Sequence, residues 1–172
     1  MTIRSLRKRI DRIDSLLLRL ISSRARLARE IGLRKKPSAG VYDPAREEEI
    51  LERIHALNPG PLPDASLAAI WREVVSACRR MEAPLRVSYL GPEATFAHAA
   101  ALARFGSSVV CVPAESVAGV FREVEKGNAD YGVVPIENSL EGAVTYTLDR
   151  LIDSELTICS EIFLPVSHGL LS

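Results

Sequence analysis

The sequence predicts two modules of different fold class, an all-α module in residues 1–83 and an α/β module in residues 84–172. The chain of 172 residues has no net charge, but residues 1–83 carry 17 basic and 11 acidic side chains, whereas residues 84–172 carry 5 and 11. The spacing of apolar residues changes at the same place, from a helical period to short apolar runs that alternate with helical segments. These coincident changes indicate two small domains with different partners.

The composition excludes several classes of protein. With 47% hydrophobic and 26% charged residues, the chain has the apolar content of a globular protein and not of a disordered one. No apolar signal segment follows the first charges, and no stretch approaches the ~18 apolar residues of a membrane span, so we expect a soluble, cytoplasmic protein. Cys78, Cys111 and Cys159 are far apart in apolar surroundings, which indicates reduced thiols. Because no metal-ligand spacing occurs, we expect no metal, no disulfide and no cofactor.

Residues 3–36 are expected to form one long helix. Their apolar positions recur in alternating steps of three and four residues, which is the spacing of a coiled-coil seam. The seam residues are Ile3, Leu6, Ile10, Ile13, Leu17, Leu20, Leu27 and Ile31. A helix that reaches about residue 36 is ~50 Å long at ~1.5 Å per residue, so it needs a second long helix to cover its stripe. The sequence therefore predicts a homodimer formed through this helix.

A charged residue, Arg24, occupies the seam position between Leu20 and Leu27. It is either a register device with a side chain that reaches solvent, or a guanidinium aimed at an anion in the bundle interior. Lys35 lies three turns further on and only ~20° around the helix axis, so both cations share one face. This shared face favours the anion-binding interpretation.

Two shorter helices are expected to complete the first module. Asp43 is a good N-cap, Pro44 suits the first helical position, and the amphipathic segment that follows ends near residue 57. A third helix is expected to begin near Asp64, because apolar residues then recur at helical spacing as far as Cys78.

This arrangement resembles the all-helical chorismate mutases, which are intertwined dimers of one long, one short and one medium helix, and the resemblance covers about the first 82 residues. It implies a set of substrate-binding side chains from all three helices: Arg7, Arg24, Lys35, Asp43, Arg46, Glu47, Cys78 and Glu82. Arg7 would reach into the partner subunit's site, and Arg24 and Lys35 would hold a carboxylate and the ether oxygen of chorismate. Glu47 would bind the ring hydroxyl. Cys78 and Glu82 stand where serine and glutamine are found in well-studied members.

The reaction implied by the resemblance explains the residue types. Chorismate is a dicarboxylate that rearranges to prephenate without covalent help, so the protein must hold the compact conformer and stabilise charge on the departing ether oxygen. Guanidinium groups match carboxylates with a rigid pair of donors. We expect Arg24, Lys35 and Glu82 to be catalytic. Glu82 can donate to the ether oxygen only when protonated, so either its environment favours the protonated form or the enzyme prefers acidic pH, unless Glu82 merely faces water at a helix end.

The second module is expected to alternate strands and helices. Strands are predicted at residues 86–90, 109–112, 131–136 and 156–165, and helices at 94–105, 117–126 and 144–152. Alternation of this kind favours a parallel sheet with helices on both faces, in which ligands bind at the carboxyl ends of the strands. Two strand-end loops, at residues 91–96 and 137–142, are therefore candidate binding loops, although their glycines and hydroxyls also suit ordinary turns and caps.

The segments GPEATF, ESVAGVFREVEKGNADYGVVPIENSLEG and LPVSHGLL resemble prephenate dehydratase, whose catalytic domain has a periplasmic-binding-protein-like fold. The resemblance implies decarboxylation and dehydration of prephenate to phenylpyruvate in a cleft. It implies these substrate-binding residues: Thr95, Glu137, Asn138, Ser139, Gly142 and His168. Ala94 and Ala97 depart from the family, which usually has glycine and serine there.

We expect the chain to be the N-terminal part of a bifunctional chorismate mutase and prephenate dehydratase of phenylalanine biosynthesis. The family's threonine-arginine-phenylalanine motif and second lobe lie beyond position 172, so we expect an incomplete, inactive dehydratase lobe. Two other functions stay open: a noncatalytic anion-binding dimer, and a basic helix that binds nucleic acid, since residues 3–36 hold 12 basic and 3 acidic residues. The basic segment has no aromatic residue to stack on bases, so we expect no nucleic-acid partner. Because no stretch is long and apolar enough to span a bilayer, we also expect no membrane partner.

Overall fold

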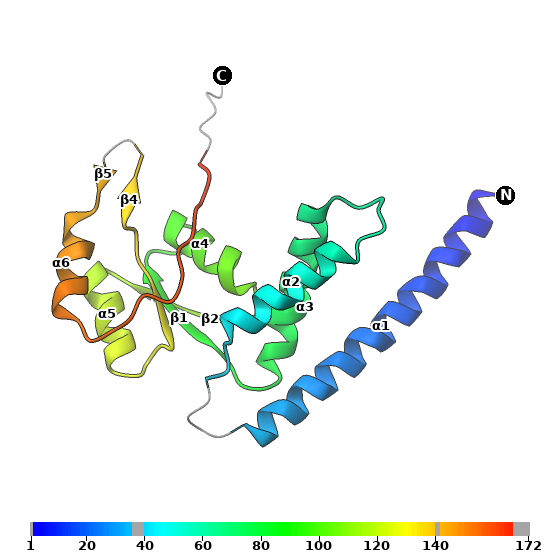
Figure 1. The fold of residues 1–172 in the computed structure, drawn as a ribbon, viewed down its shortest axis with the longest axis horizontal. Helices are drawn as coiled ribbons and strands as arrows, with labels where there is room; N and C mark the ends of the chain where they lie inside the picture. The colour runs from blue at the N-terminus through cyan, green and yellow to red at the C-terminus, as the bar shows by residue number, and fades with distance from the viewer. Residues whose placement is uncertain (1, 36–39, 140–141, 167–172) are drawn as a thin grey trace. The chain divides into compact units, whose positions relative to one another are not determined.

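The chain divides into two compact units, Met1–Pro84 and Leu85–Ser172, in a computed structural model that describes residues 2–35, 40–139 and 142–166 (Figure 1). The first unit is helical, and the second combines helices with a parallel sheet. The sequence predicts this order of fold classes correctly.

Three helices form the first unit: α1 (Ile3–Arg34), α2 (Pro44–Ala56) and α3 (Asp64–Arg80). Asp43 caps α2 as expected, because its carboxylate accepts a hydrogen bond from the Arg46 backbone N–H at 3.0 Å. Both α1 and α2 contact α3. The buried side chains of this unit come from α3, from α2 and from the segment before α2, with Cys78 only 2% exposed and Tyr42 5% exposed.

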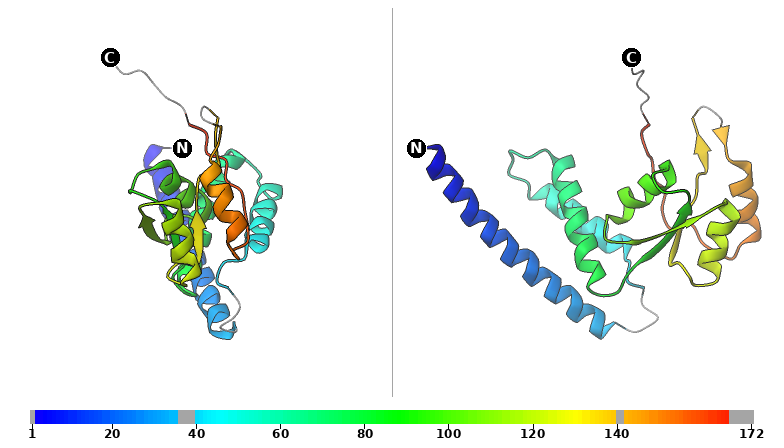
Figure 2. Two further views of the ribbon diagram at one scale, coloured as in Figure 1. Left: turned by 90° about the vertical axis from the view of Figure 1, so that its left-hand side faces the viewer. Right: turned by 180° about the vertical axis from the view of Figure 1, so that it is seen from behind.

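The long helix α1 has no buried residue. Its first half-buried residue is Ser23, and every described residue before Ser23 is exposed. The views in Figures 1 and 2 agree that the N-terminal half of α1 lies away from α2 and α3. The seam is consequently uncovered, with Ile10 55% and Leu20 58% exposed. A helix of this kind gains most of its stability only when another helix covers its apolar stripe.

The second unit is built on the three-stranded parallel sheet β2-β1-β3, with β1 (Arg86–Leu90) in the centre. Its neighbours are β2 (Val110–Ala114) and β3 (Tyr131–Val133). The helices are α4 (Phe96–Phe105), α5 (Val117–Glu125) and α6 (Thr145–Asp153). A separate antiparallel hairpin joins β4 (Glu137–Asn138) to β5 (Gly142–Ala143).

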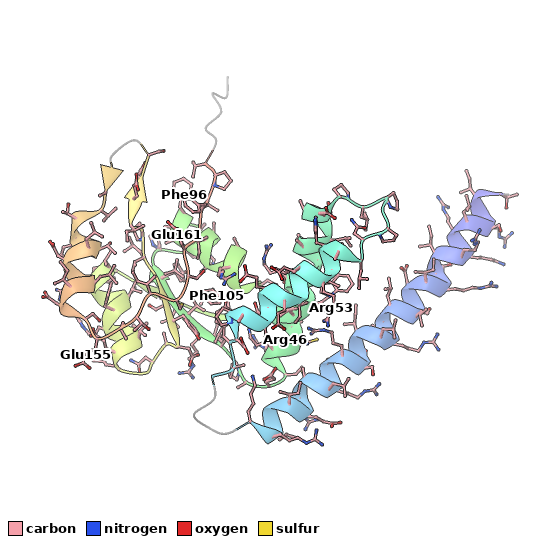
Figure 3. The ribbon with its side chains drawn as sticks, viewed as in Figure 1. Arg46, Arg53, Phe96, Phe105, Glu155 and Glu161 are labelled. Atoms are coloured by element: carbon pink, nitrogen blue, oxygen red, sulfur yellow. The ribbon has the colours of Figure 1, made fainter. Side chains whose placement is uncertain are left out.

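Helices cover both faces of this sheet, as predicted. On one face Tyr89 stacks on His98 of α4, with ring centroids 4.7 Å apart, and Phe105 of α4 meets Tyr131. Phe105 lies at the far end of α4 from the exposed Phe96 (Figure 3). On the other face α5 packs so closely that a Cβ on Gly132 would lie 2.8 Å from a methyl group of Val120. Glycine at this position lets α5 approach the sheet.

Two strand predictions need correction. The strand predicted at residues 131–136 ends at Val133, and the chain then turns into the β4–β5 hairpin. The strand predicted at residues 156–165 is wrong, because that segment forms no strand. Ile158 and Phe163 in this segment are 70% and 84% exposed, and no described strand pairs with it to supply ladder hydrogen bonds. Apolar content alone does not make a strand without a pairing partner.

Within the part of the chain that the structure describes, no helix is both long and apolar enough to cross a membrane. The same residues contain no cluster of three or more His, Cys, Asp or Glu side chains suited to a metal ion. Cys78, Cys111 and Cys159 are free thiols.

Candidate active sites

Lys35 and Glu82 come together just after the C-terminal ends of α1 and α3. Lys35 Nζ lies 2.9 Å from Glu82 Oε2, and the two side chains are 29% and 13% exposed. The helices can approach this closely because residue 32 is glycine: a Cβ there would lie 2.9 Å from the Cα of Glu82. Glu82 is therefore a half-buried partner of a cation, which excludes the alternative in which it only faces water at a helix end.

A second ion pair joins α3 to the start of α2. Arg79 is 5% exposed, its Nη1 donates to Glu47 Oε1, and the Glu47 side chain is 16% exposed. The guanidinium carbon also lies 5.2 Å from the ring centroid of Tyr42. Arg79 is not among the site residues predicted from the sequence. The available signal was its position four residues after the buried Val75, on the apolar stripe of α3, where a cation needs a partner.

Arg24 is half-buried on the C-terminal half of α1, and it has no hydrogen-bond or ion-pair partner among the described residues. Cys78 is a buried thiol one turn before Glu82 on α3. The structure thus places Lys35, Glu82 and Cys78 where α1 meets α3, with the Glu47–Arg79 pair where α3 meets α2.

The other predicted residues of the first unit lie outside this arrangement. Arg7 is exposed on the N-terminal half of α1. Asp43 is exposed and caps α2. The Arg46 side chain turns to the surface of α2, where it pairs with Glu49 at 2.7 Å with both side chains more than half exposed (Figure 3). In this single chain neither Arg7 nor Arg46 points at the Lys35–Glu82 pair.

An apolar groove of about 420 Å³ runs between α2 and α3 on the first unit. Its walls are Leu51, Glu52, Ile54, His55, Asp64, Ala65, Leu67 and Ala68. The first unit therefore exposes two apolar surfaces, this groove and the uncovered seam of α1.

In the second unit the two predicted binding loops follow the neighbouring strands β1 and β3. Thr95 is the N-cap of α4: its hydroxyl accepts from the His98 N–H at 3.3 Å and lies 3.0 Å from the carbonyl oxygens of Leu90 and Pro92. The His98 ring accepts a hydrogen bond from the Ala94 N–H through Nδ1, at 3.1 Å. The hydroxyl of Thr95 is therefore engaged in shaping the loop.

The second loop forms the β4–β5 hairpin. Glu137 pairs with Ala143 and Asn138 with Gly142, and the side chains of Glu137, Asn138 and Ser139 are exposed. Gly142 has a φ of +79°, a conformation that favours glycine. His168 lies outside the described residues.

A thiol and a phenol lie near the first loop. Burial raises the pKa of the Cys111 thiol above its usual value, and the negative charge of Glu93 adds to this effect. Burial also raises the pKa of Tyr89, and the nearby Cys111 and Glu93 raise it further by electrostatic repulsion. Because a thiolate is the reactive form, this environment makes Cys111 a poor nucleophile.

Comparison with known proteins gives a match over each unit. The family model of chorismate mutase type II matches residues 6–83, and that of prephenate dehydratase matches residues 87–172. A bifunctional chorismate mutase/prephenate dehydratase of Aquifex aeolicus is 47% identical over 175 residues, covering 99% of this chain and 48% of the relative. That of Escherichia coli K12 is 32% identical over 185 residues, covering 97% and 48%. The chain spans about half the length of the curated relatives it matches.

Among solved structures, a chorismate mutase from Thermus thermophilus is 43% identical to this chain. The match covers 46% of this chain and 92% of that one, with a TM-score of 0.45.

Proposed function

The chain belongs to the bifunctional chorismate mutase/prephenate dehydratase family, and we propose that its first unit catalyses the rearrangement of chorismate to prephenate. The observation that carries this proposal is the set of half-buried charges in otherwise apolar helices. Two carboxylates are each matched by a cation, in the pairs Lys35–Glu82 and Arg79–Glu47, and Arg24 is left over without a partner among the described residues. A surplus guanidinium in such a setting suits an anionic substrate.

In the proposed mechanism Arg24 binds a substrate carboxylate and helps to hold the compact conformer. Lys35 stabilises the negative charge that develops on the ether oxygen as its bond breaks. Glu47 accepts a hydrogen bond from the ring hydroxyl, and the buried Cys78 lines the site. As the carboxylate partner of Lys35, Glu82 takes a role different from the protonated donor expected from the sequence: it holds the flexible ammonium group of Lys35 in place.

We also propose that the first unit works as an intertwined homodimer. The uncovered seam of α1 and the apolar groove between α2 and α3 are complementary in character, and a second copy would supply the helix that the seam needs. In such a dimer Arg7 would act in the partner subunit's site, which accounts for its distance from Lys35 in one chain. Arg46 would complete the site beside Asp43 in the same assembly.

For the second unit we propose prephenate as the ligand, bound by a lobe of periplasmic-binding-protein-like fold. The parallel sheet with candidate loops after adjacent strands supports this assignment. Thr95, Glu137, Asn138, Ser139, Gly142 and His168 would line the site. Because prephenate would be the product of the first unit and the ligand of the second, we propose a place in phenylalanine biosynthesis and a cytoplasmic location.

One assay tests the mutase proposal. Purified protein is mixed with chorismate, and prephenate and phenylpyruvate are followed over time, beside the variants Arg24→Ala and Arg26→Ala. We expect prephenate to form, Arg24→Ala to lower kcat/KM about 100-fold or more, and the exposed Arg26 to be replaceable. Failure of the parent protein to consume chorismate would refute the proposal. The phenylpyruvate signal tests the separate expectation that this chain lacks dehydratase activity.

A further inference from the structure

Arg79 is the most deeply buried charged side chain among the described residues of the first unit, at 5% exposed. It is held between two groups: the carboxylate of Glu47, to which it donates, and the face of the Tyr42 ring. A buried guanidinium is costly unless it is paired, and here an anion and an aromatic face both compensate it. This degree of burial fixes the position of the Arg79 guanidinium and of the Glu47 carboxylate that it binds.

The carboxylate of Glu47 keeps acceptor capacity after this pairing. A carboxylate offers about four acceptor positions, which is more than the contact between Arg79 and Oε1 occupies. The Glu47 side chain remains 16% exposed, so part of it is open to a small molecule. Glu47 is therefore both anchored and accessible, which is what an acceptor for a substrate hydroxyl requires.

The charges around the site give a second reason for the pair. Chorismate carries two carboxylates, so an unmatched Glu47 would repel it. The pair with Arg79 offsets the Glu47 charge, just as Lys35 offsets that of Glu82 2.9 Å away. Arg24, which has no partner among the described residues, can then attract the substrate.

We infer that Arg79 is a positioning residue for the mutase reaction, which fixes Glu47 to accept the ring hydroxyl of the substrate. The inference rests on the proposed function of the first unit. It assigns Arg79 no contact with the reacting atoms. In a purely structural role, by contrast, the Arg79–Glu47 pair would only join α2 to α3.

Two substrates separate these roles. The full chain and its Arg79→Met variant are assayed with chorismate and with an analogue that keeps both carboxylates and the ether but lacks the ring hydroxyl. We expect Arg79→Met to lower kcat/KM for chorismate about 10-fold more than that for the analogue, because the analogue loses only the offset of the Glu47 charge and not a contact to its missing hydroxyl. Arg80→Met, an exposed neighbour on α3, is the matched control and should behave as the parent with both substrates.

An equal loss with both substrates would show a structural role and overturn the inference, as would no loss with chorismate. Since Arg79→Met leaves a carboxylate without its cation, Arg79→Lys serves if the methionine variant does not fold. The lysine keeps the charge but not the planar pair of donors, so a smaller loss confined to chorismate is expected. If the parent itself does not turn over chorismate, the proposed function fails, which is a different outcome from failure of the role of Arg79.

Discussion

The two units differ in where their apolar side chains lie. At the sheet of the α/β unit the core is closed by the unit's own elements: Val87 and Ala101 are fully buried and helices cover both faces, while the exposed Ile158 and Phe163 lie outside the sheet. In the helical unit the longest element contributes no buried residue, and its seam faces solvent. What the helical unit does bury includes charge, in the pairs Arg79–Glu47 and Lys35–Glu82.

The exposed apolar side chains and the buried charges of the helical unit therefore suggest two different interactions, one with another helix and one with a ligand. The exposed seam calls for another helix, because a long helix is stabilised mainly by packing of its apolar face. Beside these pairs, the half-buried Arg24 has no partner among the described residues, which favours a ligand of negative charge. In the α/β unit, where neither feature occurs at the sheet, the candidate loops are shaped by ordinary caps and turns.

The largest expected effect comes from charging the seam. Leu17→Asp would place a carboxylate where two seams meet, so we expect the dimer dissociation constant to rise about 100-fold or more, with loss of mutase activity. Sedimentation velocity over a range of protein concentrations measures the dissociation constant. Leu18→Asp is the matched control, because Leu18 lies beside the seam and is 68% exposed. Equal dimerisation by the two variants would show that the seam is not the interface.

A smaller but specific effect is expected at the close approach of α1 and α3. Glycine to alanine inside a helix normally stabilises by about 1 kcal/mol. At Gly32 the new Cβ would lie 2.9 Å from the backbone of Glu82, so the helices must move apart and Lys35 must leave Glu82. We expect Gly32→Ala to lower both the free energy of unfolding and kcat, whereas Ser22→Ala on the exposed part of α1 changes neither by much. A more stable Gly32→Ala variant with full activity would contradict the geometry.

The smallest predicted effect lies in the α/β unit. Ala94 has a φ of +67°, which is unfavourable for any residue with a Cβ. We expect Ala94→Gly to stabilise the unit by about 1 kcal/mol, measured by urea unfolding. The backbone N–H at position 94 would still donate to His98. Ala99→Gly, in the exposed middle of α4, should destabilise by a similar amount and controls for glycine itself.

The sequence was sufficient for elements whose signals are local. The seam spacing predicted α1, and Asp43 with Pro44 predicted the start of α2, because caps and periodicity depend on a few neighbouring residues. It failed for residues 156–165, where an apolar run has no described strand beside it. Pairing depends on residues distant in sequence, which a local pattern does not report.

The candidate site was predictable only in part, for the same reason. Lys35 and Glu82 come together as the family resemblance implies, although only the structure shows the ion pair and the part of Gly32 in it. Arg79 was missed because the helical period marks it as a stripe position but does not identify Glu47, 32 residues away, as its partner. Arg7 and Arg46 lie apart from the other residues in one chain, and their proposed roles depend on a second copy.

We propose that the mutase site is shared between two copies of the helical unit. Arg7→Ala and Arg24→Ala, each expected to be nearly inactive alone, test it when they are mixed, unfolded and refolded together. In a mixed dimer one site would lack both arginines, and the other would have its own Arg24 and the partner's Arg7. Random pairing therefore predicts recovery of about a quarter of the parent's mutase activity. Activity that stays at the level of the separate variants, in mixtures shown to contain mixed dimers, would contradict the claim.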